Sequence, residues 1–242
     1  MTDKKRKIVD IVSLTLISLI IMMIIIIAPG YKFGLIGVKH ELKKAEAGQT
    51  KVACIGDSLT YGSNVSDWKK NNYPTLLQNK LGNGYVVNNY GFPGATLMDT
   101  SMKYAYSKEF KKSLDFKPDI VVMMLGTNDS WRRRDQIESG FMNEYKNLIE
   151  QYRKVNKNVK FKIMIPPKAN KLIKKEMFYI KDDTLLKHIT PIIREVAESE
   201  GIDLIDLRSE FKDDKSLYSS DKVHINKKGT NKLANIIFES LK

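Results

Sequence analysis

Five short apolar runs recur along most of the chain, and segments with a helical spacing of apolar residues separate them. The run at residues 120–125, IVVMML, is apolar at successive positions, as expected of a strand covered on both faces of a sheet. Strands are predicted at Lys51–Ile55, Tyr85–Tyr90, Asp119–Leu125, Lys160–Ile165 and Ile202–Leu207. Helices are predicted at Pro74–Leu81, Met102–Leu114, Phe141–Val155, Thr184–Ser199 and Lys228–Leu241. This alternation indicates βαβ units, and therefore an α/β fold: a three-layer, flavodoxin-like α/β/α sandwich with a five-stranded parallel sheet.

A longer apolar run precedes this domain. Residues 8–28 carry a charge only at Asp10, near their start, and about 20 such residues suffice to cross the hydrocarbon core of a bilayer. Because the basic stretch Lys4–Lys7 precedes the run, the positive-inside rule predicts a cytoplasmic N-terminus and an extracellular remainder. We therefore expect a single-pass protein of the cell membrane, with an anchor in residues 1–28, a juxtamembrane tether in residues 29–49 and one domain in residues 50–242.

A cleaved signal peptide is the alternative interpretation of the apolar run. It predicts a shorter run with a small-x-small cleavage site close behind it. Pro29 directly follows the run instead, and the small pair Ala45 and Ala47 lies far beyond it. Both observations favour an uncleaved anchor.

Composition narrows the possible chemistry. The single cysteine, Cys54, excludes an intrachain disulfide and zinc sites that need several thiolates, and its place in the first strand predicts a small buried side chain. A net charge of +13 favours anionic partners, although a lysine-rich solvated surface would explain it equally well. The basic run at residues 168–175 has no interleaved aromatic residues, so we expect no nucleic-acid partner.

Glycine-rich and polar segments follow four of the predicted strands. These segments are Gly56–Leu59, Tyr90–Gly94, Gly126–Asp129 and Pro166–Pro167. Parallel strands bring their carboxyl ends to one edge of the sheet, where open α/β sheets bind ligands. We therefore expect a functional site at this edge.

Ser58 lies at such a strand-to-loop turn, where its hydroxyl would be exposed above the sheet. A serine hydroxyl is a weak nucleophile that needs a base. The candidate base is His224, because Asp221, three residues earlier in a predicted loop, can accept the Nδ1 proton and leave Nε2 to take the serine proton. The other two histidines fit less well, since His40 lies in the tether and His188 in a helical pattern.

Three groups near the strand ends are candidates for stabilising an oxyanion. They are the Asn128 side-chain amide and the backbone N–H groups of Gly91 and Ser58, each typically worth ~3 kcal/mol in a transition state. Asn128 and its neighbour Asp129 could instead form a helix cap or Asx turn, and Gly91 could be a turn glycine.

In this order, the motifs resemble the four blocks of the SGNH (GDSL-type) hydrolase superfamily, over residues 51–242. The blocks are Gly56–Leu59, Gly91, Gly126–Asp129 and Asp221–His224. The stretch Lys117–Ser130 is further similar to bacterial members that deacetylate carbohydrates, including sialate O-acetylesterase-like proteins.

The resemblance implies a role for each block. The catalytic roles would fall on the nucleophile Ser58, the base His224 and the orienting residue Asp221. The oxyanion hole would comprise Ser58, Gly91 and Asn128, while Asp57 and Asp129 would fix the loops. The implied chemistry is a two-step acyl transfer that needs no metal and no cofactor.

The expected activity is therefore that of a membrane-anchored, extracytoplasmic serine esterase acting on an O-acylated small molecule or glycan. Removal of O-acetyl groups from a saccharide or cell-wall glycan is the favoured reaction. The alternatives are an O-acetyltransferase for a cell-surface glycan, which would need a membrane partner to supply acyl groups, and a lysophospholipase or thioesterase. A non-catalytic binding module is disfavoured because all four blocks are present.

An aromatic and basic segment directly follows the third block. It consists of Trp131, Arg132, Arg133 and Arg134, and its position predicts a place at the mouth of the site. Arginine binds carboxylate or phosphate bidentately, so these residues are candidates for binding an anionic substrate group. A solvated loop is the alternative.

Overall fold

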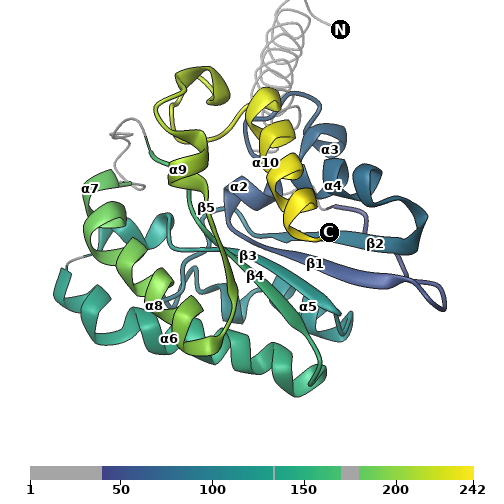
Figure 1. Cartoon of the computed structure of the whole chain (residues 1–242). Helices are drawn as coiled ribbons and strands as arrows, with labels where there is room; N and C mark the ends of the chain where they lie inside the picture. The colour runs from purple at the N-terminus through teal and green to yellow at the C-terminus, as the bar shows by residue number, and fades with distance from the viewer. Residues whose placement is uncertain (1–39, 133, 170–179) are drawn as a thin grey trace, which may run out of the picture.

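Five parallel strands form one sheet at the centre of the computed structural model, which describes residues 40–132, 134–169 and 180–242 (Figure 1). The strands are β1 Thr50–Gly56, β2 Tyr85–Gly91, β3 Ile120–Met124, β4 Lys160–Ile165 and β5 Asp203–Asp206. Their order is β2-β1-β3-β4-β5, and the inner strand β1 pairs Cys54 with Asn89 of β2 and with Val122 of β3. All five predicted strands are confirmed to within one residue at each end.

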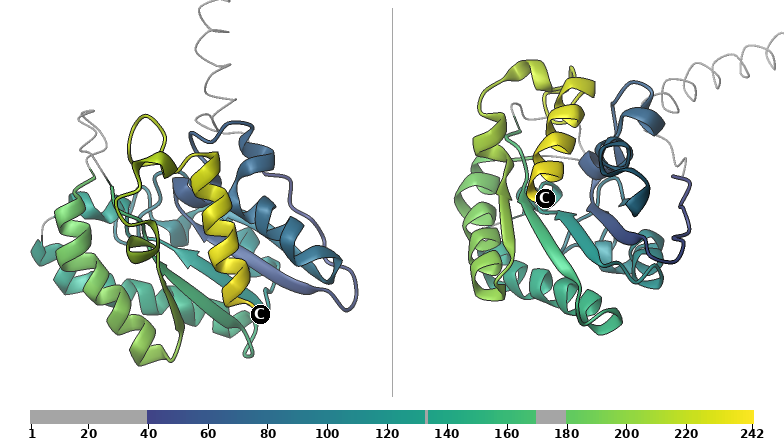
Figure 2. Two further views of the ribbon diagram at one scale, coloured as in Figure 1. Left: turned by 45° about the horizontal axis from the view of Figure 1, so that its top comes forward. Right: turned by 45° about the vertical axis from the view of Figure 1, so that its right-hand side comes forward.

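Helices cover both faces of this sheet, as Figures 1 and 2 show. One face is covered by α5 Lys108–Asp115, α6 Arg134–Val155 and α8 Thr190–Glu200, and the other by α4 Tyr73–Leu81 and α10 Lys227–Ser240. Successive residues of β1 face opposite layers: Ala53 and Ile55 pack with the first group, Val52 and Cys54 with the second. The three-layer sandwich predicted from the sequence is confirmed.

Short elements connect these layers. They are α2 Ser58–Tyr61, α3 Trp68–Asn71, α7 Asp182–Thr184, α9 Leu207–Phe211, the 3₁₀ turns η1 Gly82–Gly84, η2 Tyr104–Tyr106, η3 Asn128–Trp131 and η5 Lys215–Leu217, and the π turn η4 Leu185–Ile189. Three of them, α2, η3 and α9, begin within four residues of the ends of β1, β3 and β5.

Three predicted helices differ from those observed. The helix expected at 102–114 is divided, because the Ser107 hydroxyl accepts the Phe110 N–H at 3.0 Å and starts α5 there. The helix expected at 141–155 begins earlier, at Arg134. The helix expected at 184–199 is interrupted by the π turn η4 just before Pro191, whose missing N–H prevents a continuous helical ladder.

The tether expected at residues 29–49 is docked on the domain where the structure describes it. Residues 40–49 contain no helix, and the main chain of Lys43 exchanges hydrogen bonds of 2.8 and 2.9 Å with the side chain of Asn88. The His40 ring packs edge-on against Tyr61 and Trp68, and burial lowers the pKa of His40 to about 4. The folded unit therefore includes residues ahead of the boundary expected at residue 50.

The anchor expected at residues 8–28 lies outside the described residues. Within the described ranges, none of the helices combines the length and apolar character that crossing a bilayer requires.

Candidate active site

Ser58 is the first residue of α2, directly after the end of β1. The preceding Asp57 caps this short helix, since its carboxylate accepts the Leu59 N–H at 2.8 Å. No hydrogen bond of the Ser58 N–H occurs among the described residues. The turn therefore presents both the hydroxyl and the N–H of Ser58 at the carboxyl edge of the sheet.

The loop of residues 219–226 brings a histidine to this hydroxyl. His224 Nε2 lies 2.9 Å from Ser58 Oγ, and His224 Nδ1 lies 2.6 Å from Asp221 Oδ2. The loop is closed by its own backbone, because the Ser219 N–H donates to the His224 carbonyl at 2.8 Å. The three side chains expected to act together are thus brought into one hydrogen-bonded line from positions that are 166 residues apart.

The environment of Asp221 favours its ionised form. Its Oδ1 accepts the N–H groups of Val223 at 3.0 Å and His224 at 2.9 Å. Partial burial acts to raise the pKa of Asp221, but these hydrogen bonds and the neighbouring imidazole outweigh it and lower the pKa to about 2. Asp221 is therefore a carboxylate at any pH at which His224 must exchange protons.

Asn64 is a fourth member of this group that sequence reasoning missed. Its side-chain amide donates to Asp221 Oδ2 and lies 3.3 Å from His224 Nδ1. Asn64 adopts a left-handed conformation with φ of 63°, which asparagine tolerates better than most residues. In the sequence Asn64 is marked only by its position two residues after Gly62. That position suggests a turn, but it does not show that the side chain bonds to Asp221, 157 residues away.

Asn128 lies in η3, on the turn that follows β3. Its side-chain amide donates to the Ala95 carbonyl at 3.0 Å, and only 9% of the residue is exposed. A primary amide has two N–H donors, so this bond leaves one of them for a ligand. The turn is held by the adjacent Asp129, whose carboxylate accepts the N–H groups of Leu97 and Met98 at 3.0–3.1 Å.

Asp57 and Asp129 are both completely buried and lie on the loops that carry Ser58 and Asn128. Burial raises the pKa of Asp57 to about 6 and that of Asp129 to about 6, although backbone N–H groups oppose the shift in both. Asp57 thus accepts a hydrogen bond from the turn that carries Ser58, whereas Asp129 accepts hydrogen bonds from Leu97 and Met98 and so joins the Asn128 turn to the segment that follows β2.

The structure changes the interpretation of Gly91. Its N–H donates to Asn89 Oδ1 at 2.9 Å, so it is not free for a substrate oxygen. A Cβ at this position would overlap the backbone of Tyr61, which explains the glycine as a packing requirement where α2 crosses the end of β2. Gly94 was not singled out from the sequence; it has φ of 80°, and within the described ranges its N–H makes no hydrogen bond.

The aromatic and basic segment after Asn128 is only partly available to a ligand. Trp131 is 43% exposed, whereas Arg132 stacks on its ring at 5.0 Å and lies 3.5 Å from the Asp99 carboxylate. Arg134 bonds to Glu138 on the next turn of α6 at 2.6 Å. Arg133 lies outside the described residues. Two of the three arginines therefore already form ion pairs with acidic side chains of this chain.

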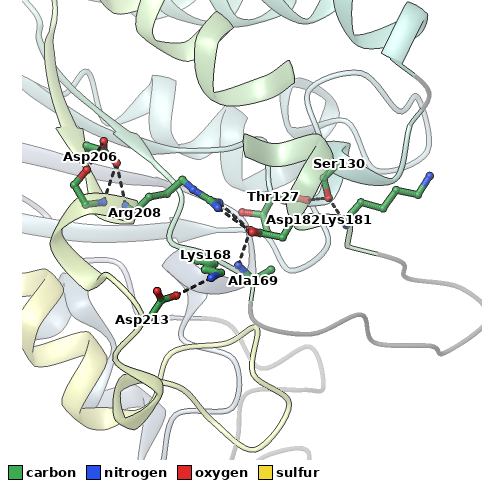
Figure 3. A network of polar contacts seen from close by, with 10 residues as sticks. Thr127, Ser130, Lys168, Ala169, Lys181, Asp182, Asp206, Arg208 and Asp213 are labelled. Carbon is green, nitrogen blue, oxygen red and sulfur yellow. Dashed lines mark hydrogen bonds and ion pairs between the residues drawn. The ribbon is translucent and has the colours of Figure 1, made fainter. Parts of the chain in front are cut away.

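A polar network ties the loop after β4 to the Asn128 turn (Figure 3). Asp182 binds the Arg208 guanidinium through two bonds of 2.8 and 2.9 Å and accepts the Ala169 N–H at 3.0 Å. The next residue back, Lys181, donates its N–H to Ser130 Oγ at 3.1 Å. Ser130 belongs to η3, so this hydrogen bond joins the segment that precedes α7 to the turn that follows β3.

Two further expectations concern side chains away from Ser58. Cys54 is completely buried, as predicted, and burial raises the pKa of its thiol, which makes it a poor nucleophile. His188 lies in the π turn, with Nδ1 3.7 Å from Glu138 Oε1.

Within the described ranges, no cluster of three or more His, Cys, Asp or Glu side chains is arranged to hold a metal ion.

The chain is similar in sequence to a known esterase. An acetylxylan esterase from Xylanibacter ruminicola is 34% identical over an alignment of 207 positions, which covers 79% of this chain and 43% of that protein. The chain thus spans less than half the length of this relative.

Solved structures share the fold. The structure of an acetyl xylan esterase superposes with a TM-score of 0.61 at 25% identity, covering 79% of this chain and 100% of that one. A carbohydrate acetylesterase from Sinorhizobium meliloti superposes with a TM-score of 0.64 at 19% identity, covering 80% and 98% of the two chains. The sequence profile of the GDSL-like Lipase/Acylhydrolase family matches residues 54–232, so this chain belongs to that family of SGNH carboxylic ester hydrolases.

Proposed function

We propose that this protein is a serine esterase that removes O-acetyl groups from a saccharide or cell-wall glycan. The observation that carries the proposal is the line of hydrogen bonds from Ser58 Oγ to His224 Nε2, at 2.9 Å, and from His224 Nδ1 to Asp221 Oδ2, at 2.6 Å. The acetylxylan esterase and carbohydrate acetylesterase among its relatives and structural neighbours support the choice of an acetylated carbohydrate.

The first half-reaction transfers the acetyl group to the enzyme. Ser58 Oγ attacks the ester carbonyl carbon while His224 Nε2 accepts the hydroxyl proton, and the ionised Asp221 stabilises the imidazolium that forms. When the tetrahedral intermediate collapses, the bond to the sugar oxygen breaks and His224 returns the proton to that oxygen. The products are a free sugar hydroxyl and an acetyl ester on Ser58.

Hydrogen-bond donors at the strand ends stabilise the oxyanion in this scheme. We assign the Ser58 N–H and the second amide hydrogen of Asn128 to this role. Gly94 replaces Gly91 as the other backbone donor, because the Gly91 N–H already bonds to Asn89. One such donor typically contributes about 10²–10³-fold to kcat.

The second half-reaction releases acetate. His224 Nε2 takes a proton from water, whose oxygen attacks the acetyl carbon on Ser58. The intermediate collapses by breaking the bond to Ser58 Oγ, which receives the proton from His224. Each proton is thus returned, and the enzyme ends in its starting state.

We also propose that residues 8–28 anchor the protein in the cell membrane, with the N-terminus in the cytoplasm and the catalytic domain outside. The uncharged apolar run and its basic flank support this topology. Because residues 40–49 are docked on the domain, only residues 29–39 remain as a spacer, with a reach of at most ~40 Å. The active site would then act on glycans close to the membrane surface.

Trp131 is our candidate for a sugar platform. The residue is 43% exposed and lies three positions after Asn128, and an aromatic face can pack against the apolar face of a sugar ring. The stacked Arg132 would orient the ring rather than act as the primary anion site.

The test is acetate release by the full-length protein in detergent, with p-nitrophenyl acetate, longer p-nitrophenyl esters and acetylated xylo-oligosaccharides as substrates. Ser58→Ala should lower kcat by at least about 10⁴-fold. The matched control is Ser139→Ala on the exposed surface of α6, which should keep full activity.

Other outcomes would change the assignment. Preference for long acyl chains would replace the acetylesterase with a lysophospholipase or thioesterase. Faster transfer to an added sugar hydroxyl than to water would indicate an O-acetyltransferase. Full activity of Ser58→Ala would overturn the acyl-enzyme mechanism.

A further inference from the structure

A cavity of about 580 Å³, lined by polar and basic residues, lies beside the active site, between the residue-64 turn and the first turn of α10. Its lining includes Asn64, Ser66, Ser219, Ser220, Lys227 and Lys228. We propose that this cavity binds an anionic group of the substrate, a carboxylate or phosphate on the acetylated glycan. The inference rests on the proposed function and names the class of glycan on which it acts.

The cavity shares a wall with the proposed catalytic residues. Asn64 lines the cavity, and its side chain bonds to Asp221 and lies 3.3 Å from His224 Nδ1. Ser219, another lining residue, donates its hydroxyl proton to the Asn64 carbonyl at 3.1 Å. A group held in the cavity is therefore separated from the catalytic line by one side chain, while Ser58 and His224 remain free for the ester.

The lining chemistry favours an anion over a neutral sugar face. Among the residues that the structure describes, the cavity wall presents hydroxyl, amide and ammonium groups and includes no acidic, aliphatic or aromatic side chain. Hydroxyl and ammonium donors together are the partners that carboxylate and phosphate oxygens need. Its volume falls within the range of roughly 300–1,000 Å³ that is usual for small-molecule sites.

Lys227 supplies the charge for this interaction. It is exposed, and within the described ranges its ammonium group has no hydrogen bond or ion pair. Lys228 is partly engaged, since its Nζ donates to Ser216 Oγ at 2.6 Å and lies 3.7 Å from Asp214. Lys227 is therefore the cation in this wall that is available to a ligand.

Two acidic groups lie near the cavity, and neither is paired with Lys227. The Asp221 carboxylate is bonded to Asn64, Val223 and His224, and Asp214 is paired with Lys228. The net charge of +13 adds a general attraction for anionic polymers.

The end of α10 does not by itself account for the site. The side chain of Asn226 accepts the N–H groups of Lys228 and Gly229 at 2.9 and 3.1 Å. These helix N–H groups are thus already satisfied, and the proposal depends on the cavity wall and on Lys227.

The decisive experiment compares Lys227→Gln with the wild-type full-length protein on matched acetylated oligosaccharides that are neutral, carboxylated or phosphorylated. Lys227→Gln should lower kcat/KM for the anionic substrates by about fivefold. Turnover of the neutral oligosaccharide and of p-nitrophenyl acetate should be unchanged. Lys80→Gln, which removes the same charge from the exposed C-terminal turn of α4, is the control and should leave all four activities unchanged.

The preference of the wild-type protein between carboxylate and phosphate identifies which anion the cavity takes. An equal effect of Lys227→Gln on neutral and anionic substrates, or no effect on either, would overturn the proposal. Failure of the esterase assignment is distinguishable, because p-nitrophenyl acetate turnover would then be absent or independent of Ser58. Calorimetric titration of Ser58→Ala with inorganic phosphate tests the cavity without turnover: weaker binding after adding Lys227→Gln supports it, and unchanged binding contradicts it.

Discussion

The loop of residues 219–226 and the turn of residues 127–132 bring side chains to the same edge of the sheet, but their carboxyl groups experience opposite electrostatics. In the first, Asp221 is half-buried beside an imidazole, and hydrogen bonds and charge lower its pKa to about 2 despite that burial. In the second, Asp129 is completely buried against the N–H groups of Leu97 and Met98, and burial raises its pKa to about 6.

The difference follows from what each carboxyl group faces. Asp221 faces His224, which becomes a cation during the proposed reaction, so a permanent negative charge lowers the free energy of that state. Asp129 faces neutral backbone groups and holds the turn that carries Asn128. Among the described residues no cation lies within hydrogen-bond distance of this carboxyl group, and its burial outweighs the favourable charge of Arg132, so ionisation is disfavoured.

Of the substitutions that test this difference, Asp221→Asn should have the largest effect on kcat. The amide keeps the shape but cannot stabilise an imidazolium, so kcat should fall by about 10³–10⁴-fold. Because the pKa of Asp221 is about 2, its own protonation should add no step to the wild-type pH profile between about pH 5 and 9. The measurement is kcat on p-nitrophenyl acetate across this range, with the exposed Asp214→Asn as control; wild-type kcat at Asp221→Asn would contradict the assigned role.

A smaller effect is expected on the other side of the comparison, at Asn128→Ala. Removing one oxyanion donor should lower kcat by about 10²–10³-fold and leave KM nearly unchanged, because the donor acts on charge that develops only in the transition state. Steady-state kinetics on the same ester, with circular dichroism to verify the fold, would measure this split. A rise in KM at constant kcat would instead assign Asn128 to ground-state binding.

The smallest effect is a pH-dependent change in stability at Asp57→Asn. The pKa of Asp57 in the folded protein is about 6, above its ordinary value of 3.8, so the folded state binds this proton more tightly than the unfolded state does. Stability is therefore lost as the pH rises from about 4 to 6, and the full cost persists above that range. Asp57→Asn should raise the free energy of unfolding at pH 8 by roughly 2–3 kcal/mol and have little effect at pH 4.

Denaturant unfolding at the two pH values checks this prediction. Asp221→Asn supplies the opposite case, because a lowered pKa stabilises the fold above pH ~4 and this contribution disappears as the pH falls through about 2. Equal changes at pH 8 and pH 4 for Asp57→Asn would show that its carboxyl group is not shifted in the folded state.

The sequence by itself determined the layers and the order of the functional segments. Strands can be recognised locally because burial on both faces demands uninterrupted apolar runs, as in β3. The pairing of Asp221 with His224 is also local, since a spacing of three residues in a short loop brings both side chains to one side. The edge location of Ser58, Asn128 and His224 then follows from the parallel topology.

Only the tertiary structure decided which groups are free and which are engaged. Asn64 joins Asp221 across 157 residues, Gly91 is committed to Asn89 and the Tyr61 backbone, and residues 40–49 dock on the domain through His40 and Lys43. None of these contacts leaves a periodic signal in the chain, because each depends on how distant loops pack. A hydrogen bond or a close steric contact depends on both residues that form it, and only folding brings these residues together.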